Sequence, residues 1–247
     1  MCTFSFVPTR YGYYAAMNRD ERLTRPRGFV PQLFQSGDLL AVYPTEPGRG
    51  TWIASNERGI TLALLNWNLP ERGGKIISRG SVIPQLIGHS DMADVAWKLS
   101  SISLEGILPF RLVGIFWPQD QICEFRWDGL TLQRFSFPWE ARHWFSSGVS
   151  DEAAGRVRGE ACQIAWADKD SGSLPWLRSL HASHVSDDGA YGICVHRPDA
   201  ATVSYSEIEF RPSALTFRYV DGSPCSNPES ISTLRVPLVF HQDLVVA

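Results

Sequence analysis

The sequence lacks the features that mark several large classes of protein. Among its 247 residues no cluster of lysines and arginines stands out, and the formal net charge is −3. There is therefore no electrostatic case for a nucleic-acid partner. The longest apolar runs, such as residues 112–117, have the length of a strand and are too short to cross a bilayer. Residues 1–21 contain no continuous apolar stretch of signal-peptide length, so we expect no membrane insertion.

The sequence also has no C-x-x-C pair. Its five cysteines are an odd number and widely spaced: Cys2, Cys123, Cys162, Cys194 and Cys225. This usage favours free thiols in a reducing compartment over a disulfide framework, with the cytoplasm as the expected location. Cys123, Cys162 and Cys194 fall within strand or helix patterns, and we expect them to be packed thiols.

Internal repeats and low-complexity linkers are absent as well. Apolar residues make up 44% and charged residues 20%, which is typical of an ordinary folded protein. Prolines and glycines are spread through turns and mark no boundary, so we expect residues 1–247 to form a single domain.

Strand patterns dominate what is present. Short β-rich runs occur in blocks separated by turn residues such as Asp128-Gly129. They predict strands over 2–7, 11–18, 50–55, 60–67, 110–117, 121–127, 130–137, 192–196, 202–210, 214–220 and 234–240. We expect four tryptophans of these runs and their ends to be core residues: Trp52, Trp67, Trp117 and Trp127.

Helical patterns lie between the strand blocks. Asp91 and Ser150 are typical N-caps, and a third, shorter helix is predicted over 174–182. The first helix has an apolar face of Met92, Val95, Ala96, Leu99 and Ile102, and the second has Val157, Ala161 and Ile164. Blocks of strands with grouped helices predict an α+β fold with mostly antiparallel sheets.

The second residue is the strongest candidate for chemistry. Removal of Met1 would leave Cys2 with both a thiol and a free α-amine. These groups titrate near pH ~8.5 and ~8, so each can exchange protons with the other near neutrality. Arg19, if the fold brings it close, would lower the pKa of the thiol. If the first two strands form a hairpin, Asn18-Arg19-Asp20-Glu21 returns towards Cys2.

Several motifs carry a family resemblance. In order along the chain they are Met1-Cys2, Asn18-Arg19-Asp20-Glu21, Arg25-Pro26, Gly50-Thr51-Trp52, Gly59 and Ala63 to Asn66, with Cys194 to Arg197 and Thr202 to Ser204 near the end. The chain thereby resembles the NRDE family, also called the transport and Golgi organisation 2 family. That family is similar to N-terminal nucleophile hydrolases of the cysteine branch, which includes penicillin V acylases and bile-salt hydrolases.

The resemblance implies a four-layer αββα sandwich of two mostly antiparallel sheets, with Cys2 at the start of a strand. It implies that Arg19 and an acidic residue hold the thiol and α-amine, and both Asp20 and Glu21 remain candidates for the acid. Asn66 would donate to the oxyanion. We predict that Cys2, Arg19, Asp20 and Asn66 converge around one cleft, supported by Asn18 and Glu21.

The chain departs from the related proteins at three places. Arg49 and Leu65 stand where members of the family usually carry glycine and threonine. A second asparagine of the cysteine branch would fall near Ser146-Ser147, where this chain has none.

Two further groups have alternative interpretations. His181 and His184 form H-x-x-H, with Asp187, Asp188 and His196 nearby, but no third metal ligand follows at a motif spacing. We therefore expect surface or hydrogen-bonding histidines and no metal. Trp139, His143, Trp144 and Phe145 form an aromatic cluster in an expected loop, which would line an apolar substrate pocket or belong to the core.

Two functions remain open. The first is an N-terminal-cysteine amidohydrolase or acyltransferase that acts on a small-molecule amide or thioester and needs no cofactor. The second is a non-catalytic carrier for an apolar ligand, either lipid or haem, on the same fold. Leu65 and the missing second asparagine favour the carrier. Without a C-x-x-C-H run, any haem would be held non-covalently.

Overall fold

Two antiparallel sheets face each other in the computed structural model, which describes residues 2–69, 76–184, 191–226 and 231–238. The first sheet has the order β10 (Arg142–Ser146), β1 (Cys2–Thr9), β2 (Gly12–Arg22), β11 (Ala200–Arg211), β12 (Ala214–Asp221) and β13 (Ile231–Pro237). The second has β3 (Phe29–Ser36), β4 (Leu39–Thr45), β5 (Ile53–Asn56), β6 (Ile60–Asn66), β7 (Phe110–Phe116), β8 (Gln121–Trp127) and β9 (Leu132–Phe137).

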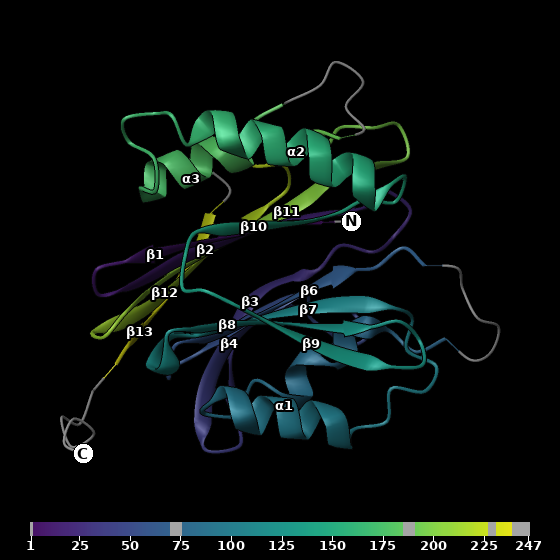
Figure 1. Ribbon diagram of the computed structural model, residues 1–247, viewed down its shortest axis with the longest axis vertical. Coiled ribbons are helices and arrows are strands. Elements are labelled where there is room, and N and C mark those ends of the chain that lie inside the picture. The colour runs from purple at the N-terminus through teal and green to yellow at the C-terminus, as the bar shows by residue number, and fades with distance from the viewer. Residues whose placement is uncertain (1, 70–75, 185–190, 227–230, 239–247) are drawn as a thin grey trace.

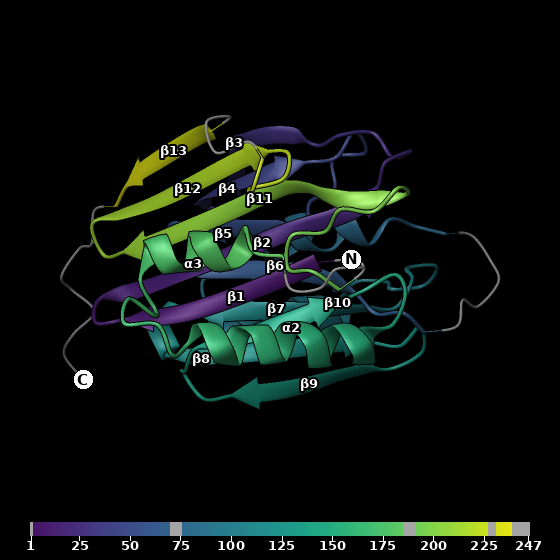
Figure 2. The same ribbon diagram turned by 90° about the horizontal axis from the view of Figure 1, so that it is seen from above.

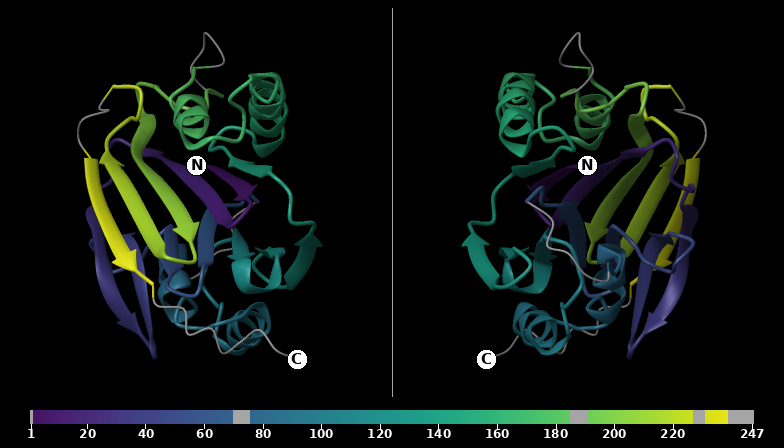
Figure 3. Two further views of the ribbon diagram at one scale, coloured as in Figure 1. Left: turned by 90° about the vertical axis from the view of Figure 1, so that its left-hand side faces the viewer. Right: turned by 90° about the vertical axis from the view of Figure 1, so that its right-hand side faces the viewer.

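Helices cover the outer face of each sheet, as Figures 1 and 3 show. Helices α2 (Asp151–Ala165) and α3 (Leu174–His181) lie over the first sheet, and α1 (Met92–Ser101) lies under the second. Short 3-10 turns occupy 79–81, 83–85 and 117–119. The expected four-layer αββα sandwich is confirmed. None of the described helices is both long and apolar enough to cross a membrane.

The N-terminal hairpin has the predicted position inside the first sheet (Figure 2). Strand β1 pairs with β2 on one side and with β10 on the other, and β2 also pairs with β11. Alternate residues of β1 and β2, including Phe4, Phe6 and Met17, enter the apolar core between the sheets. The hairpin is therefore flanked by a paired strand on each side, and one of its faces packs against the core.

Four strand assignments need correction. Residues 192–196 are not a continuous strand: the Cys194 amide donates to the carbonyl of Ser183, just after α3, the Val195 amide donates to Thr202 Oγ1, and His196 forms an isolated bridge with Ala201. The expected loop at 139–145 contains β10, which gains its partners from β1. Strands β3 and β4 were not predicted: β3 lies at an edge and its apolar residues are largely exposed, whereas β4 is mostly buried.

The helices begin where their caps predict. Asp91 Oδ1 accepts from the Asp94 amide at 2.8 Å, and Ser150 Oγ accepts from the Ala153 amide at 3.1 Å. The predicted apolar face of α1 packs on the second sheet. The predicted face of α2 is wrong, because the buried residues are Ala154, Arg158 and Cys162, while Ile164 is 75% exposed.

The layer between the first sheet and its helices contains a polar network. His181 Nε2 lies 2.9 Å from Ser5 Oγ, and Ser5 Oγ lies 2.7 Å from His143 Nδ1. Trp166 donates to His143 Nε2 at 3.2 Å, and His181 Nδ1 lies 3.1 Å from Asn18 Oδ1. Because the indole can only donate and the amide oxygen can only accept, the chain of bonds is complete when both histidines are neutral.

This network predicts acid sensitivity. Burial lowers the pKa of His143 to about 4; burial, with smaller contributions from His143 and Arg158, lowers that of His181 to about 3. Unfolded histidines bind a proton near pH ~6.5, so as the pH falls below that value the unfolded state takes up more protons than the folded state. We expect the free energy of unfolding, measured by urea titration, to fall between pH 7 and 4. The dependence should become shallower in His143→Gln, and an equally steep dependence in that variant would contradict the assignment.

Candidate functional site

Cys2 begins β1 and lies between two strands. Its Cα partners are Arg19 on β2 and Ser146 on β10. Residues directly opposite in antiparallel strands direct their side chains to the same face. Cys2 belongs to the apolar cluster between the sheets and is 6% exposed. The fold therefore places the thiol in a buried position, flanked by a guanidinium and a hydroxyl.

The environment acts on the thiol in two directions. Burial raises the pKa of Cys2, and the nearby Asp20 carboxylate adds to this effect. The positive charge at the N-terminus of the chain lowers the pKa most, followed by Arg19 and a hydrogen bond with the Asp20 backbone, but together they do not outweigh burial. The expectation that Arg19 favours the thiolate is correct for that interaction, while the net direction is the opposite. A resting thiol of this kind needs a base.

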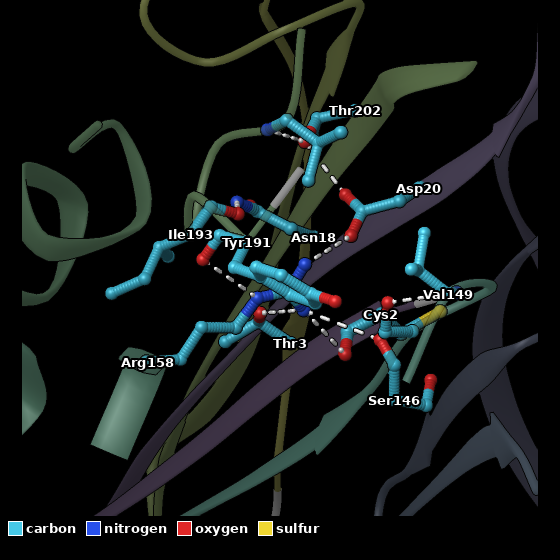
Figure 4. Close-up of polar contacts among 12 residues, drawn as sticks. Cys2, Thr3, Asn18, Asp20, Ser146, Val149, Arg158, Tyr191, Ile193 and Thr202 are labelled. Carbon is cyan, nitrogen blue, oxygen red and sulfur yellow. Dashed lines mark hydrogen bonds and ion pairs between the residues drawn. The ribbon is translucent and has the colours of Figure 1, made fainter. Parts of the chain in front are cut away.

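Arg158 was missed by the sequence analysis and lies next to the first peptide of β1 (Figure 4). Its Nη1 donates to Thr3 Oγ1 at 2.9 Å and to the carbonyls of Cys2 and Ser146, both at 3.3 Å. Its Nε donates to the Tyr191 carbonyl at 3.4 Å. The side chain is completely buried, so these acceptors replace the water that the guanidinium would otherwise bind. The sequence did contain a signal for this burial: Arg158 lies four residues from both Ala154 and Cys162, two small residues that share its helix face.

Asp20 provides the charge that pairs with Arg158. Its Oδ2 lies 3.4 Å from Arg158 Nη2, and its Oδ1 accepts from Thr202 Oγ1 at 2.6 Å. Burial raises the pKa of Asp20, whereas Arg158 and Thr202 lower it. Glu21 instead pairs with Arg25 at 2.7 Å. Of the two acids left open by the sequence, the structure therefore brings Asp20 to the first peptide.

Arg19 is buried and held from two sides. Its Nη2 donates to Glu46 Oε1 at 2.9 Å and lies 3.5 Å from Glu21 Oε2. The guanidinium carbon lies 4.4 Å from the centre of a Trp52 ring. A carboxylate and a cation–π contact thus orient Arg19 opposite Cys2.

The Gly50-Thr51-Trp52 motif has a physical explanation in this arrangement. A Cβ at Gly50 would lie 2.9 Å from the Gly80 backbone, and the Thr51 amide donates to the Gly80 carbonyl at 3.0 Å. The glycine permits this close approach, which positions Trp52 under Arg19. Arg49, just before the motif, has φ 60°, which explains why glycine suits that position.

Asn18 has a structural environment on the helix side of the sheet. Its Nδ2 donates to the carbonyls of His181 and Ile193, both at 2.8 Å. Asn18 therefore ties β2 to the end of α3 and to the loop that precedes β11. Both ring nitrogens of His181 lie at hydrogen-bond distance from residues of this network, so His181 does not act together with His184 as the H-x-x-H pattern would suggest.

Asn66 is placed differently from the other predicted residues. Its Oδ1 accepts from Arg79 Nη1 at 3.2 Å, and no hydrogen bond joins it to Cys2 within the described parts of the chain. Leu65, the preceding residue, is in the same apolar cluster as Cys2. An amide does occur near Ser147: Asn68 Nδ2 donates to the Ser147 carbonyl and, at 3.2 Å, to Asp151 Oδ1.

The aromatic cluster is divided between two layers. Trp139 and Trp144 pack in the core between the sheets, and the Trp144 ring lies 5.6 Å from that of Phe4. Phe145 packs instead with the residues under α2 and α3. The alternation of β10 explains this separation, since successive side chains point to opposite faces.

The two sheets and the helices that cover them are arranged as in two solved structures of hydrolytic enzymes. The C2A mutant of the conjugated bile acid hydrolase from Clostridium perfringens matches with a TM-score of 0.51 at 11% identity, covering 98% of this chain and 100% of that chain. Penicillin V acylase from Agrobacterium tumefaciens matches with a TM-score of 0.50 at 11% identity, covering 97% and 99%. At this identity the similarity shows the fold alone.

The family follows from the sequence. The model of the family described as "Transport and Golgi organisation 2" matches residues 1–132, and the chain belongs to this family. No curated protein matches the chain.

The Arg158–Asp20 pair predicts a large effect on stability. We expect Arg158→Met to lower the free energy of unfolding by about 3 to 5 kcal/mol, because the variant leaves the Asp20 carboxylate buried without its counter-charge. The exposed Arg156 on the same helix gives a matched control, and Arg156→Met should change the value by about 0.5 kcal/mol or less. Equal stability of the two variants, by urea unfolding, would show that the pair is not needed.

Proposed function

We propose that this protein is an N-terminal-cysteine hydrolase that transfers the acyl group of a small-molecule amide or thioester to water. Removal of Met1 would make Cys2 the nucleophile. One observation carries the proposal: β1 begins at Cys2, and Asp20 and the buried Arg158 are held against that first peptide. Because burying an ion pair carries a desolvation cost, such a pair beside the first residue of an interior strand points to a functional role.

The chemistry needs only groups of this chain and water. The Cys2 thiol transfers its proton to the α-amine as the sulfur attacks the carbonyl carbon, which forms a tetrahedral oxyanion. When the C–N or C–S bond breaks, the α-ammonium returns the proton to the leaving group. Water then attacks the acyl-thioester and releases the carboxylic acid and the free thiol. The raised pKa of Cys2 fits a thiol that depends on this adjacent base.

Neighbouring residues have supporting roles in the proposal. Asp20 offsets the positive charge of the α-ammonium, and Arg158 positions Asp20 and the first peptide. Arg19 stabilises the developing thiolate from the opposite strand. Asn66 remains the predicted oxyanion donor, with Arg79 orienting its amide.

Ser146 is a further candidate donor for the oxyanion. It lies opposite Cys2, and its buried Oγ has no hydrogen-bond partner among the residues that the structure describes. A donor aimed at a developing oxyanion contributes roughly 3 kcal/mol to lowering the barrier. We propose that this hydroxyl takes the part of the second asparagine that the chain lacks.

The carrier function has one observation in its favour. Cys2 and Leu65 lie in the same apolar cluster, and burial raises the pKa of the thiol. An apolar ligand would be compatible with these surroundings. All five cysteines are free thiols in the structure, so for either function we propose a reducing compartment such as the cytoplasm.

The rate of alkylation distinguishes the two functions. In protein that lacks Met1, we expect iodoacetamide to label Cys2 faster than a peptide with a free thiol, because the adjacent amine accepts the proton. Insertion of one glycine before Cys2 keeps the thiol but moves the amine to another residue. This matched variant should label about tenfold more slowly, the change in thiolate that corresponds to about one pKa unit.

Peptide mass mapping measures the label at each cysteine, and Arg19→Ala should also slow the reaction at Cys2. If Cys2 of the processed protein labels no faster than the peptide and the inserted glycine has no effect, the nucleophile is not activated. The carrier would then be the better account.

A further inference from the structure

Two cysteines and two histidines gather beside the loop that precedes β11. Cys194 and His196 come from this loop, Cys225 follows β12, and His184 follows α3. Cys194 Sγ lies 3.5 Å from Cys225 Sγ and 3.6 Å from His196 Nε2. His196 Nε2 lies 3.1 Å from Cys225 Sγ. Ligand atoms of His184, His196 and Cys225 all lie within 4.8 Å of one another.

These separations are close to those around a tetrahedral ion. Zinc binds thiolate sulfur at about 2.3 Å and imidazole nitrogen at about 2.0 Å, so the edges of its tetrahedron measure about 3.3 to 3.8 Å. The distances among Cys194, His196 and Cys225 are 3.5, 3.6 and 3.1 Å, so two lie within this range and the third, from His196 Nε2 to Cys225 Sγ, is slightly shorter. His184 is the candidate for the fourth ligand, since one of its ring nitrogens lies within 4.8 Å of the ligand atoms of His196 and Cys225.

We infer that Cys194, His196, Cys225 and His184 bind one zinc ion in a Cys₂His₂ site. Two thiolates and two imidazoles are a ligand set that favours zinc over calcium or magnesium, which prefer oxygen. None of these four residues has a role in the proposed hydrolysis.

A disulfide between Cys194 and Cys225 is the competing explanation. The two sulfurs are 3.5 Å apart, whereas a disulfide bond measures about 2.05 Å. A disulfide would also leave unexplained why His184 and His196 converge on the same sulfur. The arrangement of all four side chains is the reason to prefer the ion.

The ion would fix the loop that contacts the candidate site. This loop supplies the Ile193 carbonyl to Asn18 and the Tyr191 carbonyl to Arg158. The following strand supplies Thr202 Oγ1 to Asp20. Zinc would therefore join three segments that the chain connects only through long intervals, and would stabilise the folded state by binding to it alone.

The test is zinc content of the full-length purified protein. After incubation with zinc sulfate and gel filtration in metal-free buffer, we expect one zinc per chain by mass spectrometry of the elements. Cobalt should give the visible absorption bands of tetrahedral thiolate coordination. Cys225→Ser and His196→Gln, which alter partly exposed or exposed residues, should lose the ion, and an unchanged far-ultraviolet circular dichroism spectrum would show that they fold.

Control variants keep the interpretation specific. Cys123→Ser and Cys2→Ala lie outside the cluster and should retain one zinc per chain, so failure of the hydrolase proposal would leave this result unaffected. Three outcomes would overturn the inference: no zinc retained, zinc retained equally by Cys225→Ser and His196→Gln, or a Cys194–Cys225 disulfide in intact mass measured under conditions that preserve thiols.

Discussion

The buried guanidinium of Arg158 is the constraint on which the N-terminal part of the structure depends. Its contacts join α2 to β1, β10 and the Tyr191 loop, and its charge is paired with Asp20 on β2. A cation without water must be surrounded by acceptors, so the helix has to present position 158 to the sheet. This requirement explains the orientation of α2 and the exposure of Ile164. It also holds the first peptide of the strand in one place.

The surroundings of Cys2 differ on the two faces of the first sheet. On the helix side of the sheet, Asp20 and Arg158 form a polar layer continuous with the Asn18–His181 contacts. On the side facing the second sheet, the thiol lies in an apolar core with Arg19 opposite. The thiol is thereby kept protonated until a base next to it takes the proton. An α-amine on Cys2 itself would be such a base, and it would stand beside the polar layer.

Local patterns were enough to predict the hairpin, the caps at Asp91 and Ser150 and the mostly antiparallel sheets, whereas the four-layer architecture was implied by the family resemblance. Interactions between distant segments were not readable in the same way. The sequence analysis missed Arg158 because its partner Asp20 is 138 residues away, and the buried face of α2 is therefore shifted by one position from the predicted face. Strand β10 was missed because it forms by pairing with β1. Strand β3 was missed because it lies at the edge of its sheet and shows little alternation of buried and exposed residues. The Cys194, His196 and Cys225 cluster has no regular spacing and becomes visible only in three dimensions.

The central claim is that Cys2 becomes the first residue of the working protein. The most direct measurement is the intact mass of the full chain, produced with its natural start and without an N-terminal tag. The account predicts a mass that lacks Met1, together with an N-terminal peptide that begins at Cys2. A chain that retains Met1 would have no free amine on Cys2, and that result would contradict the account.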